Sequence, residues 1–147
     1  MIQRKQTVFL LLACAAAVVC LCLPLGSLEL AGMGKEPVLY NLASIDGNGA
    51  YNFRYCALSV LLSLSGLLSL VTIFLYKNRK LQMKLCKCNL VLLVLWYALL
   101  TYIIYANENF HQAIAACLPF VSAVFVWLSH RGILSDEKLV RAADRIR

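Results

Sequence analysis

Long, uninterrupted apolar runs dominate the hydrophobic pattern of this chain. Four runs, at residues 7–25, 56–76, 89–106 and 112–130, contain no Asp, Glu, Lys or Arg. Each run is close to the roughly 20 residues that a helix needs to cross about 30 Å of hydrocarbon. Because the runs are apolar on every side instead of alternating with period two, they indicate helices and not barrel strands. The pattern predicts an all-α membrane protein with four transmembrane helices, forming one domain over residues 1–147.

The stretch between the first two runs is too long for a simple turn. Residues 38–44 and 50–55 have strand-like composition, and Asp46-Gly47-Asn48-Gly49 between them offers the positive φ angles that a tight hairpin requires. We therefore expect a small β-hairpin in this first outer loop. An isolated hairpin is only marginally stable in water, so it would rest on the helix ends or on a partner.

The last polar stretch, residues 133–147, predicts a short amphipathic helix separate from the fourth run. Ser135 is a typical helix cap, and the two acidic residues that follow it are favoured by the helix dipole. Apolar side chains then recur on one face and charged ones on the other. This helix could lie on the membrane surface, dock to a soluble partner, or be a solvated tail. The residues expected to contact a partner or lipid are Leu139, Arg141, Ala143, Arg145 and Ile146.

Composition supports the membrane interpretation. The 147 residues are 62% apolar and only 14% charged, and the mean hydropathy is +0.77. Soluble domains are roughly 45–50% apolar and about 25% charged. These values exclude a disordered chain, a collagen and a soluble enzyme core. The net charge of +7 calls for an explanation, and membrane topology accounts for it without nucleic acid as a partner.

The cations are distributed very unevenly along the chain. Twelve of the 14 Lys and Arg residues lie in the amino-terminal tail, in the segment 77–88 between the second and third runs, or in the carboxyl tail. By the positive-inside rule, both termini and this short basic loop are expected in the cytoplasm. The loop could hold anionic lipid headgroups, or it could be a topology determinant with no further role. Its basic residues are Lys77, Arg79, Lys80, Lys84 and Lys87.

The first run has a rival interpretation, since Arg4 and Lys5 before an apolar stretch also fit a secretory signal. The only cleavage box is a loose one at Cys14, and the apolar region before it would be at the short end of the expected range. The run also continues to Leu25 without polar relief. We interpret it as an uncleaved helix.

Small residues mark the faces on which helices can approach closely in lipid. Their spacing of three or four residues places them in stripes along single helices. In the fourth run, Pro119 is expected to bend the helix by removing one backbone donor. The predicted helix-packing residues are Ala13 and Ala17, then Ser59, Ser63, Gly66 and Ser69, and finally Ala116 and Ala123.

The seven cysteines are the main set of chemically reactive side chains in the sequence. A membrane thiol-disulfide oxidoreductase is one alternative function, carried by outer-half Cys22, Cys56 and Cys117. The spacing argues against it, because the chain has no CxxC, and Cys20 and Cys22 point about 200° apart on a helix. No metal-ligand set, P-loop, GxGxxG, GxSxG or HExxH motif is present either. We therefore expect no enzyme activity, no metal and no cofactor.

Transport is the remaining functional class to consider for a small membrane helix bundle. Ionisable residues inside the membrane usually mark ion paths, and the four runs have no Asp, Glu, Lys or Arg. A small oligomeric pore remains an alternative. It would be lined by Ser63, Ser65, Ser69 and Thr72.

The two ends of the chain carry a family resemblance. The start Met1-Ile2-Gln3-Arg4 and the end DEKLVRAADRIR at 136–147 resemble short, uncharacterised bacterial inner-membrane proteins, the domain of unknown function 4293. The resemblance implies a Gram-negative host and four helices, and it implies no activity. We expect a non-enzymatic accessory or assembly subunit of the inner membrane, multi-pass with both termini inside. Its expected partners are the lipid bilayer, anionic headgroups, and a membrane or cytoplasmic protein or a second copy, but not nucleic acid.

Overall fold

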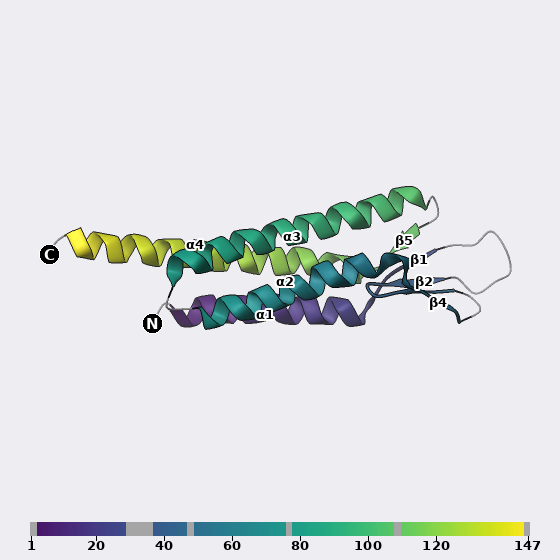
Figure 1. Ribbon diagram of the computed structural model, residues 1–147, viewed down its shortest axis with the longest axis horizontal. Helices are drawn as coiled ribbons and strands as arrows, with labels where there is room; N and C mark the ends of the chain where they lie inside the picture. The colour runs from purple at the N-terminus through teal and green to yellow at the C-terminus, as the bar shows by residue number, and fades with distance from the viewer. Residues whose placement is uncertain (1–2, 29–36, 47–48, 76–77, 108–109, 146–147) are drawn as a thin grey trace.

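A bundle of four long helices forms the body of the protein (Figure 1). The computed structural model describes residues 3–28, 37–46, 49–75, 78–107 and 110–145. Around the bundle, α1 and α3 each contact both α2 and α4, so neighbouring helices run antiparallel. By length and composition, all four helices could span a membrane. The helices are α1 (Gln3–Cys22), α2 (Cys56–Phe74), α3 (Arg79–Ala106) and α4 (Leu118–Arg145).

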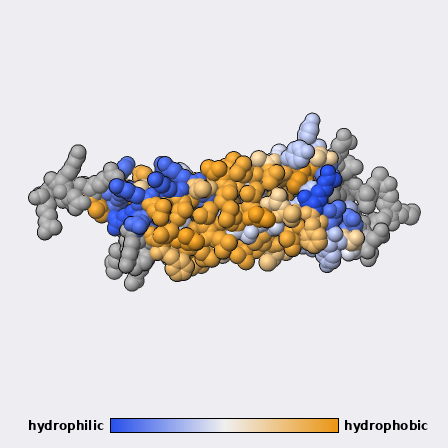
Figure 2. All heavy atoms as spheres, in the orientation of Figure 1, coloured by the Kyte–Doolittle hydropathy of each residue, from blue (hydrophilic) through white to orange (hydrophobic). Residues whose placement is uncertain are grey.

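The distribution of apolar and polar residues on the surface fits helices that could span a membrane. Figure 2 shows apolar residues covering the middle of the molecule, with hydrophilic residues gathered towards both ends. The start of α1 and the end of α4 lie at one end of the molecule, together with the end of α2 and the start of α3 (Figure 1). We call this the basic end, after its cations Lys80, Lys84, Lys87, Arg131 and Lys138.

A five-stranded antiparallel sheet covers the opposite end, which we call the sheet end (Figure 1). The strand order is β4-β3-β2-β1-β5. Two short 3-10 helices, η1 (Phe53–Tyr55) and η2 (Ile114–Cys117), lead from the sheet into α2 and α4. The strands are β1 (Pro24–Leu28), β2 (Val38–Tyr40), β3 (Ser44–Ile45), β4 (Tyr51–Asn52) and β5 (Phe110–Gln112).

The hairpin predicted in the first outer loop is present, but its strands differ from the prediction. The segment 38–44 is not one strand, because the chain turns back on itself where the Tyr40 N–H donates to the Ala43 carbonyl at 3.0 Å. β3 then pairs with β4 across the predicted turn, where Gly49 has a φ of 78°. Residues 47–48 of that turn lie outside the described residues. The expected strand 50–55 is limited to Tyr51–Asn52 before η1 begins.

Two strands of the sheet were not predicted, and they shorten the predicted spans. The first helix ends at Cys22 because Pro24 begins β1, a position where a strand tolerates proline. β1 pairs with β2 on one side and with β5 on the other. β5 follows α3 in the sequence. A Cβ on Gly26 would lie 2.3 Å from the His111 carbonyl oxygen, so only glycine allows β1 and β5 to approach this closely.

The third and fourth helices extend further towards the basic end than predicted. The expected basic loop at 77–88 is helical from Arg79 onward, because Gln82, Cys86 and Asn89 continue one buried stripe. The expected separate helix at 133–147 is instead the end of α4. Its buried residues Ser129, Ile133 and Asp136 also recur every three or four positions, and no new cap forms at Ser135.

Pro119 does not bend the fourth helix. It is the second residue of α4, and η2 precedes it. The first N–H groups of a helix have no partner within the helix, so proline costs nothing there. The predicted span 112–130 therefore divides into part of β5, then η2, and then the helix.

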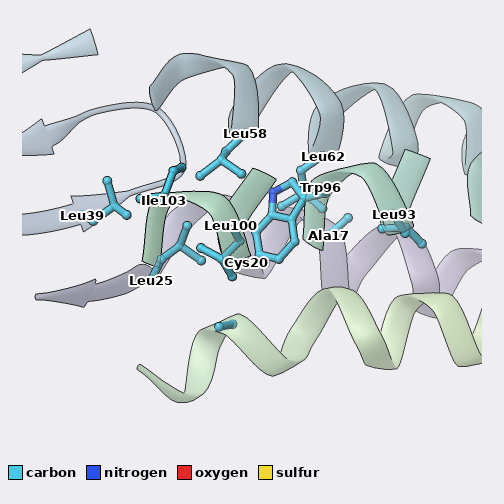
Figure 3. Packing of buried hydrophobic residues seen from close by; sticks show 11 residues of the cluster. Ala17, Cys20, Leu25, Leu39, Leu58, Leu62, Leu93, Trp96, Leu100 and Ile103 are labelled. Atoms are coloured by element: carbon cyan, nitrogen blue, oxygen red, sulfur yellow. The ribbon is translucent and has the colours of Figure 1, made fainter. Parts of the chain in front are cut away.

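The largest core cluster joins the helices to the sheet (Figure 3). Trp96 of α3 is completely buried at its centre, between residues of α1 and α2. Leu25 and Leu39 reach this cluster from β1 and β2, so the sheet shares one core with the bundle. A second cluster around Leu10 and Val126 fills the half of the bundle nearer the basic end.

Candidate functional site at the basic end

The basic end presents a row of lysines on one face of α3. Lys80, Lys84 and Lys87 are all exposed, and their spacing of four and three residues places them one above another. On α4, the Arg131 guanidinium lies 4.5 Å from the centre of the Trp127 ring, in a cation–π contact. Arg79 is half-buried, and Lys77 lies outside the described residues. Four of the five basic residues predicted for this segment are thus held on a helix.

A buried carboxyl group ties the helices together at this end. Asp136 of α4 is only 7% exposed, and the Gln6 amide of α1 donates to its Oδ2 at 2.5 Å. The Arg79 guanidinium of α3 donates to the Asp136 backbone carbonyl at 3.5 Å. The Ser129 hydroxyl donates to the Gln6 carbonyl at 3.4 Å. We call Gln6, Asp136 and Arg79 the Asp136 cluster. It fixes α4 against two other helices close to where the bundle ends.

The last turns of α4 project beyond the rest of the bundle (Figure 1). Leu139 is 59% exposed and Val140 is 44% exposed, and both follow Asp136 in the projecting part of α4. The other predicted contact residues are Arg141, Ala143, Arg145 and Ile146. Ile146 and the side chains of the other three lie outside the described residues.

The predicted packing residues fall into buried and exposed groups. Ala13, Ala17, Gly66, Ser69 and Ala116 are buried, and a Cβ added to Gly66 would lie 3.9 Å from that of Ala17. In contrast, Ser59 and Ala123 are half-buried, and Ser63 is exposed. The buried face of α2 shares Gly66 and Ser69 with the predicted stripe but lies one position before Ser59 and Ser63. Its residues are Leu58, Leu62, Ser65, Gly66, Ser69 and Thr72.

The bundle interior holds polar contacts that the sequence pattern did not reveal. Asn89 of α3 is 1% exposed; its Oδ1 accepts from the Ser65 hydroxyl at 2.5 Å, and its Nδ2 donates to Ser69 Oγ at 2.8 Å. Nearer the basic end, the Gln82 amide donates to the Thr72 carbonyl at 3.2 Å. These bonds join α2 to α3. The helical spacing of Gln82 and Asn89, seven residues apart, was the available signal for them.

A second buried amide joins the sheet to the bundle. The Asn41 Nδ2 group donates to the Cys20 carbonyl at 2.7 Å, and its Oδ1 accepts from the Trp96 indole N–H at 3.2 Å. Three segments, from α1, α3 and the β2–β3 turn, therefore meet at one fully buried side chain. Asn41 was predicted only as part of a strand, and nothing in its local sequence identifies this role.

The structure also shows the positions of the cysteines of the alternative thiol oxidoreductase and of the hydroxyl residues of the alternative pore. All seven cysteines fall in described segments as free thiols, and Cys22, Cys56 and Cys117 are exposed. Of the four hydroxyls expected to line a pore, Ser65, Ser69 and Thr72 face the interior of their own bundle, whereas Ser63 does not. Within the described residues, no three His, Cys, Asp or Glu side chains are grouped so that they could hold a metal ion.

Comparison with known proteins gives one informative result. A search among curated proteins finds no match. The profile of a family described as "Domain of unknown function (DUF4293)" matches residues 2–146. Since this match covers nearly the whole chain, the protein belongs to the DUF4293 family.

Proposed function

We propose that this protein is a non-enzymatic accessory or assembly subunit of the bacterial inner membrane. In this proposal both termini face the cytoplasm, and the basic end is the docking surface. The projecting end of α4 binds a membrane or cytoplasmic protein, and the lysines of α3 hold anionic lipid headgroups.

The observation that carries the proposal is the continuity of α4 past the Asp136 cluster. Residues 137–145 extend about 13 Å at about 1.5 Å per residue. Asp136 fixes the helix against α1 and α3 just before this extension, so the extension has a defined direction. A rigid helix end with exposed Leu139 and Val140 suits a partner groove, because little ordering entropy is lost on binding.

The lysine row supports the lipid part of the proposal. Each basic residue near an anionic surface contributes about 1 kcal/mol, so three lysines together favour anionic headgroups by about 3 kcal/mol. The cation–π contact of Arg131 with Trp127 also pairs a cation with an aromatic side chain that is typical of the membrane interface.

Partner binding is tested by affinity purification from gently solubilised membranes. The variant L139S/V140S changes only exposed side chains beyond the Asp136 cluster, and we expect it to lose the partner that the unaltered chain retains. The matched control is Ile114→Ser, which removes an aliphatic side chain that is 91% exposed at the sheet end. If both variants retain the same proteins, the end of α4 is not the docking element.

Lipid binding is tested by native mass spectrometry with phosphatidylglycerol competing against phosphatidylcholine. We expect the variant K80Q/K84Q/K87Q to lose preference for phosphatidylglycerol by up to about 100-fold, since about 3 kcal/mol is removed. Arg54→Gln at the sheet end is the control for the loss of an exposed cation. An unchanged preference in the triple variant would contradict the proposal.

The orientation is tested with reporter fusions. A reporter that is active only in the periplasm should give a signal when it is inserted between β3 and β4. It should give none when inserted between α2 and α3. The reverse result would place the basic end outside and overturn the docking proposal.

A further inference from the structure

An apolar cavity of about 460 Å³ lies at the sheet end, on the opposite side of the molecule from the proposed docking surface. Its volume falls within the roughly 300–1,000 Å³ of sites that bind small molecules. No charged residue is among its lining residues in the described part of the chain. The lining includes Leu21 at the end of α1, Tyr40 and Leu42 near β2, Ile45 of β3, Tyr51 of β4 and Phe53 of η1.

The cavity uses the face of the sheet that is turned away from the core. Ile45 pairs with Tyr51, whereas their neighbours Ser44 and Asn52 form the next pair on the opposite face. Leu39, which pairs with Ser44, is completely buried in the core on that opposite face. A sheet with one wet face normally alternates apolar and polar residues, but here Ile45 and Tyr51 make the second face apolar as well.

Three apolar side chains around this cavity are more than half exposed in the described chain. Leu42, Tyr51 and Phe53 are 56%, 67% and 59% exposed. Apolar surface costs about 25 cal/mol per Å² when it remains in water. A surface of this kind, gathered around a cavity, is typical of a binding site.

One side of the cavity lining belongs to α1. Leu21 lines it, and Val18 and Leu11 lie below Leu21 on the same side of the helix at spacings of three and seven residues. Val18 and Leu11 are both more than half exposed, on a helix that could span the membrane. An alkyl chain in the membrane next to α1 could therefore enter the cavity without crossing water.

We propose that this cavity holds an acyl chain of a phospholipid from the surrounding bilayer. The uncharged lining excludes a headgroup as the bound part, and the tyrosines at the rim have the mixed polarity of the membrane interface. The bound chain covers the outer face of the sheet, as the bundle covers its inner face.

The proposal is tested with the full-length protein in detergent micelles. Trace phosphatidylcholine with a photoactivatable diazirine on one acyl chain is added, so that only a retained lipid is crosslinked. We expect the crosslinked adducts, mapped by mass spectrometry, to concentrate on residues 40–45 and 51–53. Ala43→Phe fills the cavity from within its lining and should lower these adducts by about tenfold, since even a few buried methylenes change occupancy by that order. Ile114→Phe, at an exposed site outside the lining, should leave them unchanged.

The outcomes separate the lipid from other occupants. If Ala43→Phe fails to fold, Leu42→Glu places a charge at an exposed position of the rim and should give the same loss of adducts. Adducts spread evenly over the four helices, or unchanged adducts in the folded variants, would overturn the proposal. So would a stable dimer crosslinked through residues 42–53 without lipid, which would identify a second copy as the occupant.

Discussion

Replacement of Asn89 by alanine is the sharpest test of how the bundle is held together. Asn89 is buried in α3, where it accepts a hydrogen bond from Ser65 and donates one to Ser69. Both partners belong to α2, so the substitution removes two bonds between these helices at once. In lipid there is little hydrophobic drive between helices, and such bonds act together with close packing.

The size of the effect follows from the partners that remain. An interhelical hydrogen bond in a membrane contributes about 0.6 kcal/mol on average and about 1.7 kcal/mol at most. The Ser69 hydroxyl still donates to the Ser65 carbonyl at 3.0 Å in the variant. The Ser65 hydroxyl can turn to a carbonyl of its own helix, as Ser63 does to Ser59. We therefore expect Asn89→Ala to lower the free energy of unfolding by about 1–2 kcal/mol.

The assay is reversible unfolding in mixed micelles, followed by far-UV circular dichroism. Ser65→Ala should cost about 0.6 kcal/mol and should show coupling to Asn89→Ala in a double-mutant cycle. Ser63→Ala is the matched control: its hydroxyl is exposed and bonds only within α2, so its effect should stay within about 0.5 kcal/mol. The absence of coupling between Ser65→Ala and Asn89→Ala, or no effect of Asn89→Ala, would refute the reasoning.

Three further predictions concern the sheet and the basic end. Asn41→Leu leaves the Trp96 indole N–H without its acceptor, at a cost of about 1–3 kcal/mol, and hydrogen exchange in β1–β3 should accelerate more than in α2. Gly26→Ala forces β1 away from β5, so amide exchange should rise in residues 110–112, whereas Gly49→Asn, at a positive φ with open space around it, should leave exchange unchanged. Gln6→Ala removes a hydrogen bond to a carboxyl group and should destabilise the protein by about 1.5–3 kcal/mol. Gln6→Ala should destabilise the protein less when Asp136 is already replaced by leucine. An equal loss of stability in both backgrounds would show that the Gln6–Asp136 hydrogen bond contributes nothing.

The sequence alone determined the number of long helices and their approximate positions. Four apolar runs leave no other backbone arrangement that satisfies its own polar groups in lipid. The turn at Gly49 was also readable from local sequence, because few residues adopt a positive φ. The resemblance seen at the two ends of the chain indicated the DUF4293 family, and the match over residues 2–146 confirms that the chain belongs to it.

Where the helices end was decided by tertiary contacts. Hydropathy ends the fourth run at about residue 130, but α4 continues because Asp136 is bonded to Gln6, a residue at the other end of the chain. Likewise, α3 begins at Arg79 because Gln82 packs against α2 and bonds to Thr72. A hydropathy window assigns such polar residues to loops, since it does not register a partner that is distant in sequence.

The sheet and both proposed binding surfaces also depend on the tertiary structure. β1 begins inside the first apolar run and β5 has only three residues, so local sequence identifies neither strand. They pair because they follow the ends of α1 and α3. Asn41 is unremarkable in the sequence until Cys20 and Trp96 surround it. The local sequence pattern shows which side of each segment faces water or lipid. Which segments pair with each other depends on contacts between residues that are distant in sequence, and only the folded structure shows these contacts.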